Sequence, residues 1–182
     1  MDCTPITGQM RLGDSGSKQK CPGIDKPSVI NALDVFHGVK TGKNIIIVGG
    51  GIVGCEAALI LGKKGAKITL TSRQSEIARG LSVEMKRAFR RIITELDVNM
   101  VTGVRLEEVT DKGILVSDQQ SRMITIEGDT VAIAAGFKPN LGLWDELSKI
   151  SEMEVFAIGD CVEPRTCYDA IHEGFHAAFK LL

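Results

Sequence analysis

The feature that most constrains this chain is a glycine-rich turn of the form G-x-G-x-x-G, made by Gly49, Gly51 and Gly54. A mostly apolar run, Asn44 to Val48, precedes the turn, and an Ala- and Leu-rich stretch that ends near Lys64 follows it. Such an apolar run is typical of a strand buried on both faces of a parallel sheet, and the stretch after the turn predicts a helix. A strand, a glycine turn and a helix in this order predict a Rossmann-like, doubly wound α/β fold.

The rest of the chain supplies further elements of such a fold. Short alternating runs separated by turn residues over about residues 104–128 predict an antiparallel β-meander, which we expect as an excursion on one face of the sheet. The other predicted elements are a short helix from about Asn31 to Val39, a strand from Lys67 to Ser72, a helix from about Ser82 to Leu96, strands at Asn99 to Thr102, Thr130 to Ala134 and Glu154 to Ile158, and a helix over about the last dozen residues.

Composition and charge exclude several functional classes. The chain has 182 residues, 43% of them hydrophobic, and a formal net charge of -1, so it offers no positive field for nucleic acid. Its one basic cluster lies opposite apolar residues at helical spacing and is predicted to be a solvated helix face. That cluster consists of Lys86, Arg87, Arg90 and Arg91.

The sequence predicts neither a membrane span nor a metal site. The longest apolar run, Ile45 to Leu61, contains Glu56 and is followed by Lys63 and Lys64. The N-terminus has no apolar core of signal-peptide length, so we expect a cytoplasmic location. The five cysteines form no C-x-x-C pair, and the histidines show no third ligand.

The glycine turn has the properties that a dinucleotide pyrophosphate requires. This anion must approach the backbone closely and binds the free N–H groups at a helix N-terminus, here those of Ile52 and Val53. We expect Gly49 to make the turn, Gly51 to admit the phosphates, and Gly54 to let the helix pack on the strand. The alternative is a tight strand-to-helix turn that binds no ligand.

The residues after the second strand indicate which dinucleotide is preferred. In many such folds an acidic residue at this place accepts hydrogen bonds from the adenosine ribose 2′-hydroxyl. Here the strand ends in Ser72 and Arg73, and the first carboxylate, Glu76, lies beyond it. Because a hydroxyl and a guanidinium can bind a 2′-phosphate dianion, we predict NADP(H) in preference to NAD(H). The alternative is that Arg73 is a solvated surface charge.

Four stretches resemble the 2,4-dienoyl-CoA reductase and NADH:flavin oxidoreductase family, whose members join a flavin barrel to a two-dinucleotide module. They cover most of the chain after residue 20, and the last is the most specific. They are "PGIDKPSVINALDV" (Pro22 to Val35), "IIIVGGGIVGCEAA" (Ile45 to Ala58), "DTVAIAAGFKPN" (Asp129 to Asn140) and "EVFAIGDCVEPRTCYDAIHEGFHAA" (Glu154 to Ala178).

The resemblance implies roles for five further residues. Asp160 of "AIGD" would contact the ribityl chain of FAD, beside Gly159, and the helix around Ala170 would direct its N-terminus at the flavin. Gly136 would belong to the cofactor-binding set. Glu56 would lie near the nicotinamide, or it is an exposed residue that only favours the helix dipole. Asp160 could alternatively just cap the turn after its strand.

The resemblance also implies what the chain does as a whole. Residues 1–27 are expected to be a partly disordered lead-in loop, residues 28–140 an NAD(P)-binding domain, and residues 141–182 the C-terminal segment of an incomplete FAD domain. Hydride would pass from NAD(P)H to FAD for reduction of an enoyl- or dienoyl-CoA-like substrate. The other FAD half and a barrel with FMN and a 4Fe-4S cluster would belong to an N-terminal part that is missing here, so this chain would be inactive alone. No residue is a predicted proton-transfer catalyst.

Two other functions fit part of the pattern. One is a pyridine-nucleotide-disulfide reductase, although its redox C-x-x-C or C-x4-C pair is absent from the sequence. The other is a non-catalytic module that only binds the nucleotide.

Overall fold

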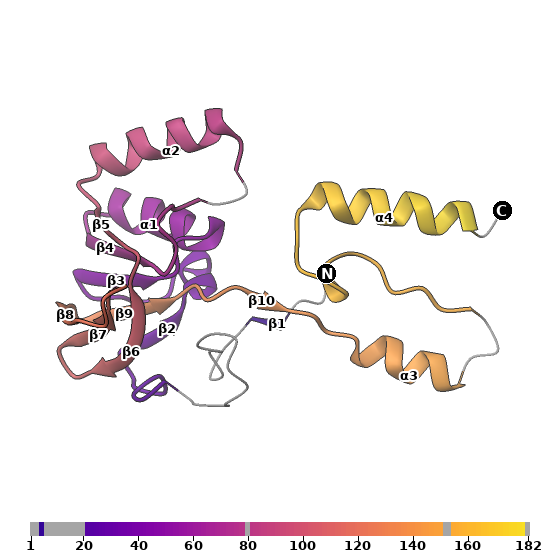
Figure 1. Cartoon of the computed structure of the whole chain (residues 1–182), viewed down its shortest axis with the longest axis horizontal. Helices are drawn as coiled ribbons and strands as arrows, with labels where there is room; N and C mark the ends of the chain where they lie inside the picture. Colours follow the sequence, from indigo (N-terminus) through magenta and orange to yellow (C-terminus); the bar gives the residue numbers. More distant parts are fainter. Residues whose placement is uncertain (1–3, 6–20, 79–80, 151–153, 181–182) are drawn as a thin grey trace. The chain divides into compact units, whose positions relative to one another are not determined.

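The structure, a computed structural model, describes residues 4–5, 21–78, 81–150 and 154–180 (Figure 1). The chain forms two compact units. The larger one is Thr7–Gly136, and the smaller one combines Met1–Ile6 with Phe137–Leu182. Most of the predicted lead-in loop lies outside the described residues.

A five-stranded parallel sheet forms the centre of the larger unit. Its order is β2 (Val29–Asn31), β9 (Thr130–Ile133), β3 (Asn44–Val48), β4 (Lys67–Ser72) and β5 (Asn99–Thr102). From β3 the chain moves to β4 and β5 on one side and later returns to β9 on the other side. The strand order therefore reverses between β3 and β9, which confirms the predicted Rossmann-like fold.

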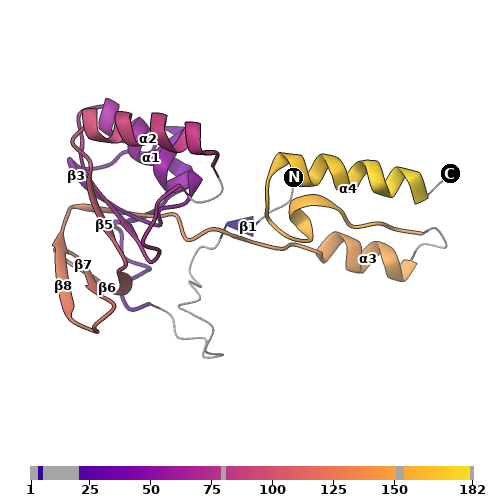
Figure 2. The same cartoon turned by 45° about the horizontal axis from the view of Figure 1, so that its top comes forward.

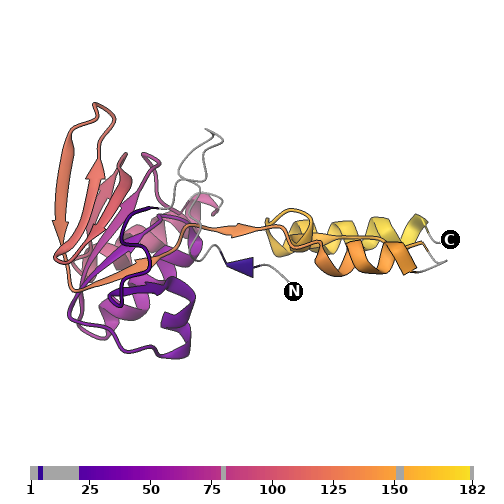
Figure 3. The same cartoon turned by 90° about the horizontal axis from the view of Figure 1, so that it is seen from below.

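The two faces of the parallel sheet are covered differently (Figures 2 and 3). Ile45 and Ile47 of β3 pack with α1 (Ile52–Lys63), α2 (Val83–Glu95) and the 3-10 helix η1 (Ala32–His37). Ile46 points to the other face, where it packs with the antiparallel meander. The meander consists of β6 (Arg105–Thr110), β7 (Gly113–Ser117) and β8 (Met123–Glu127). The predicted excursion on one face is thus confirmed.

Side-chain caps determine where α2 and η1 begin. The Ser82 hydroxyl accepts the Met85 N–H at 3.3 Å, so α2 starts where the sequence predicts. The predicted helix from Asn31 to Val39 is corrected, because Asn31 ends β2 and its side chain accepts the Leu33 N–H at 3.0 Å, which starts the shorter η1.

Among the described residues, no helix has the length and apolar character needed to cross a membrane.

The smaller unit contains mainly helices. They are α3 (Gly142–Ile150), the 3-10 helix η2 (Gly159–Cys161) and α4 (Cys167–Lys180), and β10 (Phe137–Lys138) pairs with β1 (Thr4–Pro5). The predicted strand from Glu154 to Ile158 is wrong, because no described strand runs beside it to complete a ladder. This segment lies between α3 and α4, and its Val155 carbonyl accepts the Trp144 indole N–H at 3.0 Å.

Asp129 joins the start of β9 to the start of β3. Its Oδ2 accepts the backbone N–H groups of Lys43 at 3.0 Å and Asn44 at 2.9 Å, and its Oδ1 accepts the Thr130 hydroxyl at 3.1 Å. Burial acts to raise the pKa of the Asp129 carboxyl, but the hydrogen bonds from Asn44 and Lys43 outweigh it and lower the pKa below its usual value. The ionised carboxylate therefore stabilises the junction of these two strands.

We expect Asp129→Asn to lower the free energy of unfolding by about 1–2 kcal/mol at pH 7, because an amide offers only one acceptor oxygen. A depressed pKa stabilises the fold above the unfolded-state value of about 3.9 and ceases to do so as the pH falls through the folded-state pKa. The difference between wild type and variant should thus shrink at pH 3. Urea unfolding at both pH values measures it, with Glu127→Gln, at an exposed neighbouring carboxylate, as control. Equal differences at both pH values would contradict the prediction.

Candidate nucleotide-binding site

The glycine turn joins the carboxyl end of β3 to the start of α1, at the point where the strand order reverses. The Gly49 N–H donates to the Thr71 carbonyl at 2.9 Å, and Gly49 has a φ of 126°. A Cβ at Gly49 would lie 2.2 Å from the Ala134 carbonyl oxygen, and one at Gly54 would lie 1.9 Å from the Gly49 carbonyl oxygen. Both positions therefore require glycine for close packing. Ala134, which follows β9, is a part of the turn's surroundings that the sequence analysis did not identify.

Gly51 differs from the other two glycines of the motif. A Cβ there would meet nothing within 4 Å, and its backbone is extended, with φ -74° and ψ -176°. Gly51 is the N-cap of α1, no described side chain caps this helix, and its first turn holds no acidic residue. The N-terminus of α1, at Ile52 and Val53, thus has free space and a positive dipole end, which fit a pyrophosphate.

The end of β4 lies against the glycine turn. A Cβ at Gly50 would be 2.8 Å from the Ser72 Cβ, and the Gly50 carbonyl accepts the Ala78 N–H at 2.7 Å. Ser72 is buried, and its hydroxyl accepts the Gln74 N–H at 3.1 Å. Arg73 is exposed and forms no ion pair with any residue that the structure describes. Ser72 therefore adjoins the turn, and Arg73 follows it directly, exposed and without an ion pair to the described residues.

Two other predicted residues of the larger unit are more peripheral. Glu56 is exposed on α1, which suits either of its two predicted roles. Gly136 is exposed beyond the carboxyl end of β9, and a Cβ there would meet nothing within 4 Å. Cys55, next to Glu56, is buried, and burial raises the pKa of its thiol to about 11. This thiol stays protonated at neutral pH, so it is not a redox nucleophile.

The remaining predicted residues come together within the smaller unit. A Cβ at Gly159 would lie 3.4 Å from the Ala170 Cβ, so the turn that carries Asp160 packs on the first half of α4. Asp160 Oδ1 accepts the Arg165 N–H at 3.2 Å, whereas its Oδ2 accepts no hydrogen bond from the described residues. An apolar cavity of about 470 Å³, lined by Trp144 among others, reaches Gly159, Asp160 and Ala170.

Glu173 holds this turn and was not among the residues predicted from the sequence. Glu173 of α4 accepts the Gly159 N–H at 2.6 Å with Oε2, and its Oε1 pairs with the Arg165 guanidinium. The sequence contains only a weak signal for it, a carboxylate three residues after Ala170 and one helical turn along the same helix. Glu173 fixes the peptide that precedes Asp160.

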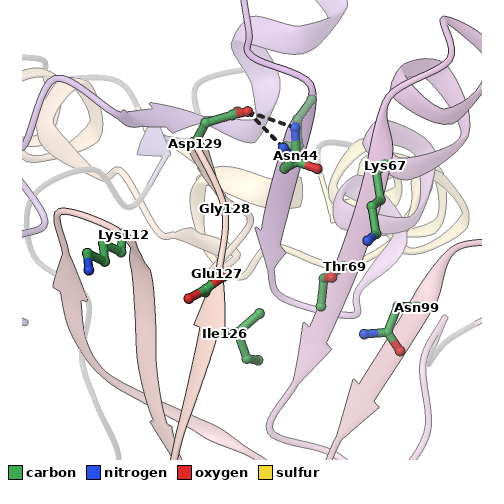
Figure 4. Close-up of a pocket in the computed structure, with 10 residues that line it drawn as sticks. Asn44, Lys67, Thr69, Asn99, Lys112, Ile126, Glu127, Gly128 and Asp129 are labelled. Carbon is green, nitrogen blue, oxygen red and sulfur yellow. Dashed lines mark hydrogen bonds between the residues drawn. The ribbon is translucent and has the colours of Figure 1, made fainter.

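Another cavity, of about 800 Å³, lies in the larger unit. It is at the amino ends of the parallel strands, opposite the end that carries the glycine turn (Figure 4). Lys67, Thr69 and Asn99 line one side, and Ile126 and Glu127 of β8 line the other. No residue predicted to bind a cofactor lines it. The candidate nucleotide site is therefore the glycine turn and not this larger polar cavity.

Comparison with known proteins agrees with this geometry. Residues 12–174 match the family described as pyridine nucleotide-disulphide oxidoreductase. The chain is 29% identical over 178 residues to the NADH oxidase of Thermoanaerobacter brockii, covering 92% of this chain and 27% of the oxidase. It is 27% identical over 174 residues to the nitric oxide reductase FlRd-NAD(+) reductase of Escherichia coli O7:K1, covering 85% of this chain and 46% of that protein.

A solved structure of 2-naphthoyl-CoA reductase in complex with 2-naphthoyl-CoA superposes with a TM-score of 0.78 and 29% identity, over 87% of this chain and 24% of that one. The chain thus spans between about a quarter and a half of the length of these relatives. The match covers both units and includes the glycine turn, the meander and most of α4. This chain belongs to the pyridine nucleotide-disulphide oxidoreductase family, whose members are FAD- and NAD(P)-binding oxidoreductases.

Proposed function

We propose that the chain binds NADP(H) at its glycine turn, and NAD(H) more weakly, as the nucleotide-binding part of a flavin-dependent oxidoreductase. The observation that carries this proposal is the open, uncapped N-terminus of α1 at Gly51, at the switch point between β3 and β9. Ile52 and Val53 would direct their N–H groups at the pyrophosphate. Ser72 and Arg73 would hold the ribose end, since Arg73 has no competing ion pair among the described residues.

The smaller unit would contribute to an FAD site. When bound, the nicotinamide and the flavin supply the hydride-transfer chemistry, and the protein supplies position and electrostatics. The Asp160 Oδ2 accepts no hydrogen bond from the described residues, so it is suited to accept hydrogen bonds from ribityl hydroxyls. The N-terminal turn of α4, which packs beside Gly159 through Ala170, would stabilise negative charge on a reduced flavin. None of these residues moves a proton.

The surface of the smaller unit supports a further partner. Neither α3 nor α4 has a buried residue within the described chain, and Leu143, Ile150, Tyr168 and Phe175 are between 59% and 79% exposed. A set of apolar side chains of this kind is typical of an interface. We propose that the other half of an FAD domain covers it, and that a flavin barrel with FMN and a 4Fe-4S cluster adjoins that half. The isolated chain would then be inactive.

For the substrate we propose an unsaturated acyl-CoA, of the enoyl or dienoyl type. The support is the 29% identical structure of 2-naphthoyl-CoA reductase in complex with 2-naphthoyl-CoA. The contacts to such a substrate would lie in the barrel and not in this chain.

The two alternatives make different predictions. This chain itself contributes no redox pair to a disulfide reductase, because its sequence has no C-x-x-C and its two buried thiols, Cys21 and Cys55, have pKa values raised by burial to about 11. A non-catalytic nucleotide module fits the same glycine turn. A purified preparation that is yellow, with flavin absorbance, would support the flavin enzyme. A colourless preparation that binds NADPH would show a separated nucleotide domain, which fits both the module and a flavin enzyme whose other FAD half lies outside this chain.

Nucleotide binding is tested by thermal unfolding. We expect 1 mM NADPH to raise the melting temperature of the chain by several degrees and NADH to raise it less. A ligand that binds only the native state stabilises it by about 2.7 kcal/mol at 100 times its Kd. Differential scanning fluorimetry, with adenosine as a control that lacks the pyrophosphate, measures the effect. If neither dinucleotide moved the midpoint, the proposal would be overturned.

A further inference from the structure

Residues 73–78, the described part of the loop after β4, are held beside the glycine turn. Its Ala78 N–H donates to the Gly50 carbonyl at 2.7 Å, and Ile77 is buried where a Cβ at Gly50 would meet it at 2.9 Å. At the other end of the loop, the Gln74 N–H donates to the Ser72 hydroxyl. Glu76, inside this loop, is therefore held on the side of the site where the adenosine ribose is proposed to bind.

Glu76 is the first carboxylate after β4, and it does not stand alone. Its Oε1 lies 3.3 Å from Lys86 Nζ and 3.6 Å from Arg90 Nη2, both on α2. Lys86 and Arg90 are one helical turn apart, so the two cations approach the same oxygen from one face of the helix. The Lys86 side chain is only 24% exposed, whereas Glu76 is 47% exposed.

The net charge of Glu76, Lys86 and Arg90 affects whether a 2′-phosphate or a 2′-hydroxyl is preferred at this place. A bare carboxylate at this place would repel a 2′-phosphate, whereas a 2′-hydroxyl carries no charge to repel. Two cations against one carboxylate leave the cluster with one positive charge in excess, and Arg73 adds another on the same loop. The basic residues Lys86 and Arg90, which the sequence analysis assigned to a solvated face, thus have a specific partner.

We propose that Lys86 and Arg90 strengthen the preference for a 2′-phosphorylated dinucleotide by neutralising Glu76. They act through the charge of Glu76, so they are specificity residues that need not touch the ligand. This inference rests on the proposed binding of NADP(H) to the glycine turn.

The test compares dissociation constants for NADPH and NADH by isothermal titration calorimetry on the whole chain. Replacing both cations, Lys86→Met with Arg90→Met, should weaken NADPH binding about tenfold and change NADH binding less than about twofold. Glu76→Gln should strengthen NADPH binding about threefold. The matched control is Arg87→Met with Arg91→Met, which removes the same charge from the same helix but leaves Glu76 paired. Salt at 1 M, where the Debye length is about 3 Å, should reduce the difference.

The outcomes distinguish a failure of the proposed NADP(H) preference from a failure of the role given to Lys86 and Arg90. A wild type that binds both nucleotides equally overturns the proposed preference and this inference with it. A wild type that prefers NADPH, with the same ratio in the Lys86 and Arg90 variant, overturns the inference alone, as does an equal loss in the control. If the double variant fails to fold, Glu76→Gln decides, because an unchanged or lower NADPH to NADH affinity ratio is contrary to the proposal.

Discussion

Gly51→Ala is expected to abolish most nucleotide binding without unfolding the protein. Gly54→Ala, in contrast, should lower the stability of the fold at the glycine turn. A Cβ at Gly51 meets nothing within 4 Å and the backbone there suits any residue, so the loss of stability should stay below about 1 kcal/mol. The added methyl would occupy the space through which the pyrophosphate approaches the start of α1. We expect NADPH affinity to fall at least about 30-fold, or about 2 kcal/mol.

Gly54→Ala is expected to change the stability of the protein, whereas Gly51→Ala changes its affinity for the nucleotide. Its Cβ would lie 1.9 Å from the Gly49 carbonyl oxygen and 3.2 Å from the Ala134 Cβ, so the turn must shift its backbone. The expected cost is about 3 kcal/mol, which corresponds to roughly 10 °C in the melting temperature. Thermal unfolding of both variants with and without NADPH separates the two effects. A Gly51→Ala protein that keeps wild-type NADPH affinity would show that the turn is only a structural connection.

Local sequence patterns were sufficient to predict the central strands of the parallel sheet. The bounds of β3, β4 and β5 agree with the sequence prediction, because each is a short run with β-branched residues between breakers or helix caps. The three-residue β2 was missed, because so short a strand is defined by its pairing with β9 and not by its own sequence. The opposite error occurred at Glu154 to Ile158, where a strand-like sequence has no described partner.

The candidate site divides in the same way. The three glycines, Ser72 and Arg73 can be predicted as site residues because they lie in one motif and at the end of the next strand along the chain. The contacts of Ala134 with the turn and of Glu173 with Gly159 join segments that are distant or on different elements. A single sequence cannot reveal such pairs, because burial and hydrogen bonding between elements depend on how the chain folds back on itself.

The charge at the end of β4 should decide which dinucleotide the protein prefers, and Arg73→Glu is the sharpest test. Arg73 is exposed and has no ion pair among the described residues, so its replacement costs little stability. A glutamate there can accept hydrogen bonds from a ribose 2′-hydroxyl and repels a 2′-phosphate. We expect the ratio of NADPH to NADH affinity to fall about 100-fold, or about 2.7 kcal/mol, with NADH binding unchanged or improved.

Calorimetric titration with both nucleotides at one ionic strength measures this ratio. Arg87→Glu is the matched control, since it makes the same change in net charge at an exposed position of α2. A general loss of positive field would move both variants alike, whereas a specific contact with the 2′-phosphate moves only the Arg73 variant. If the Arg73→Glu protein kept the wild-type ratio, Arg73 would be a solvated surface charge, and the preference would have to come from another part of the site.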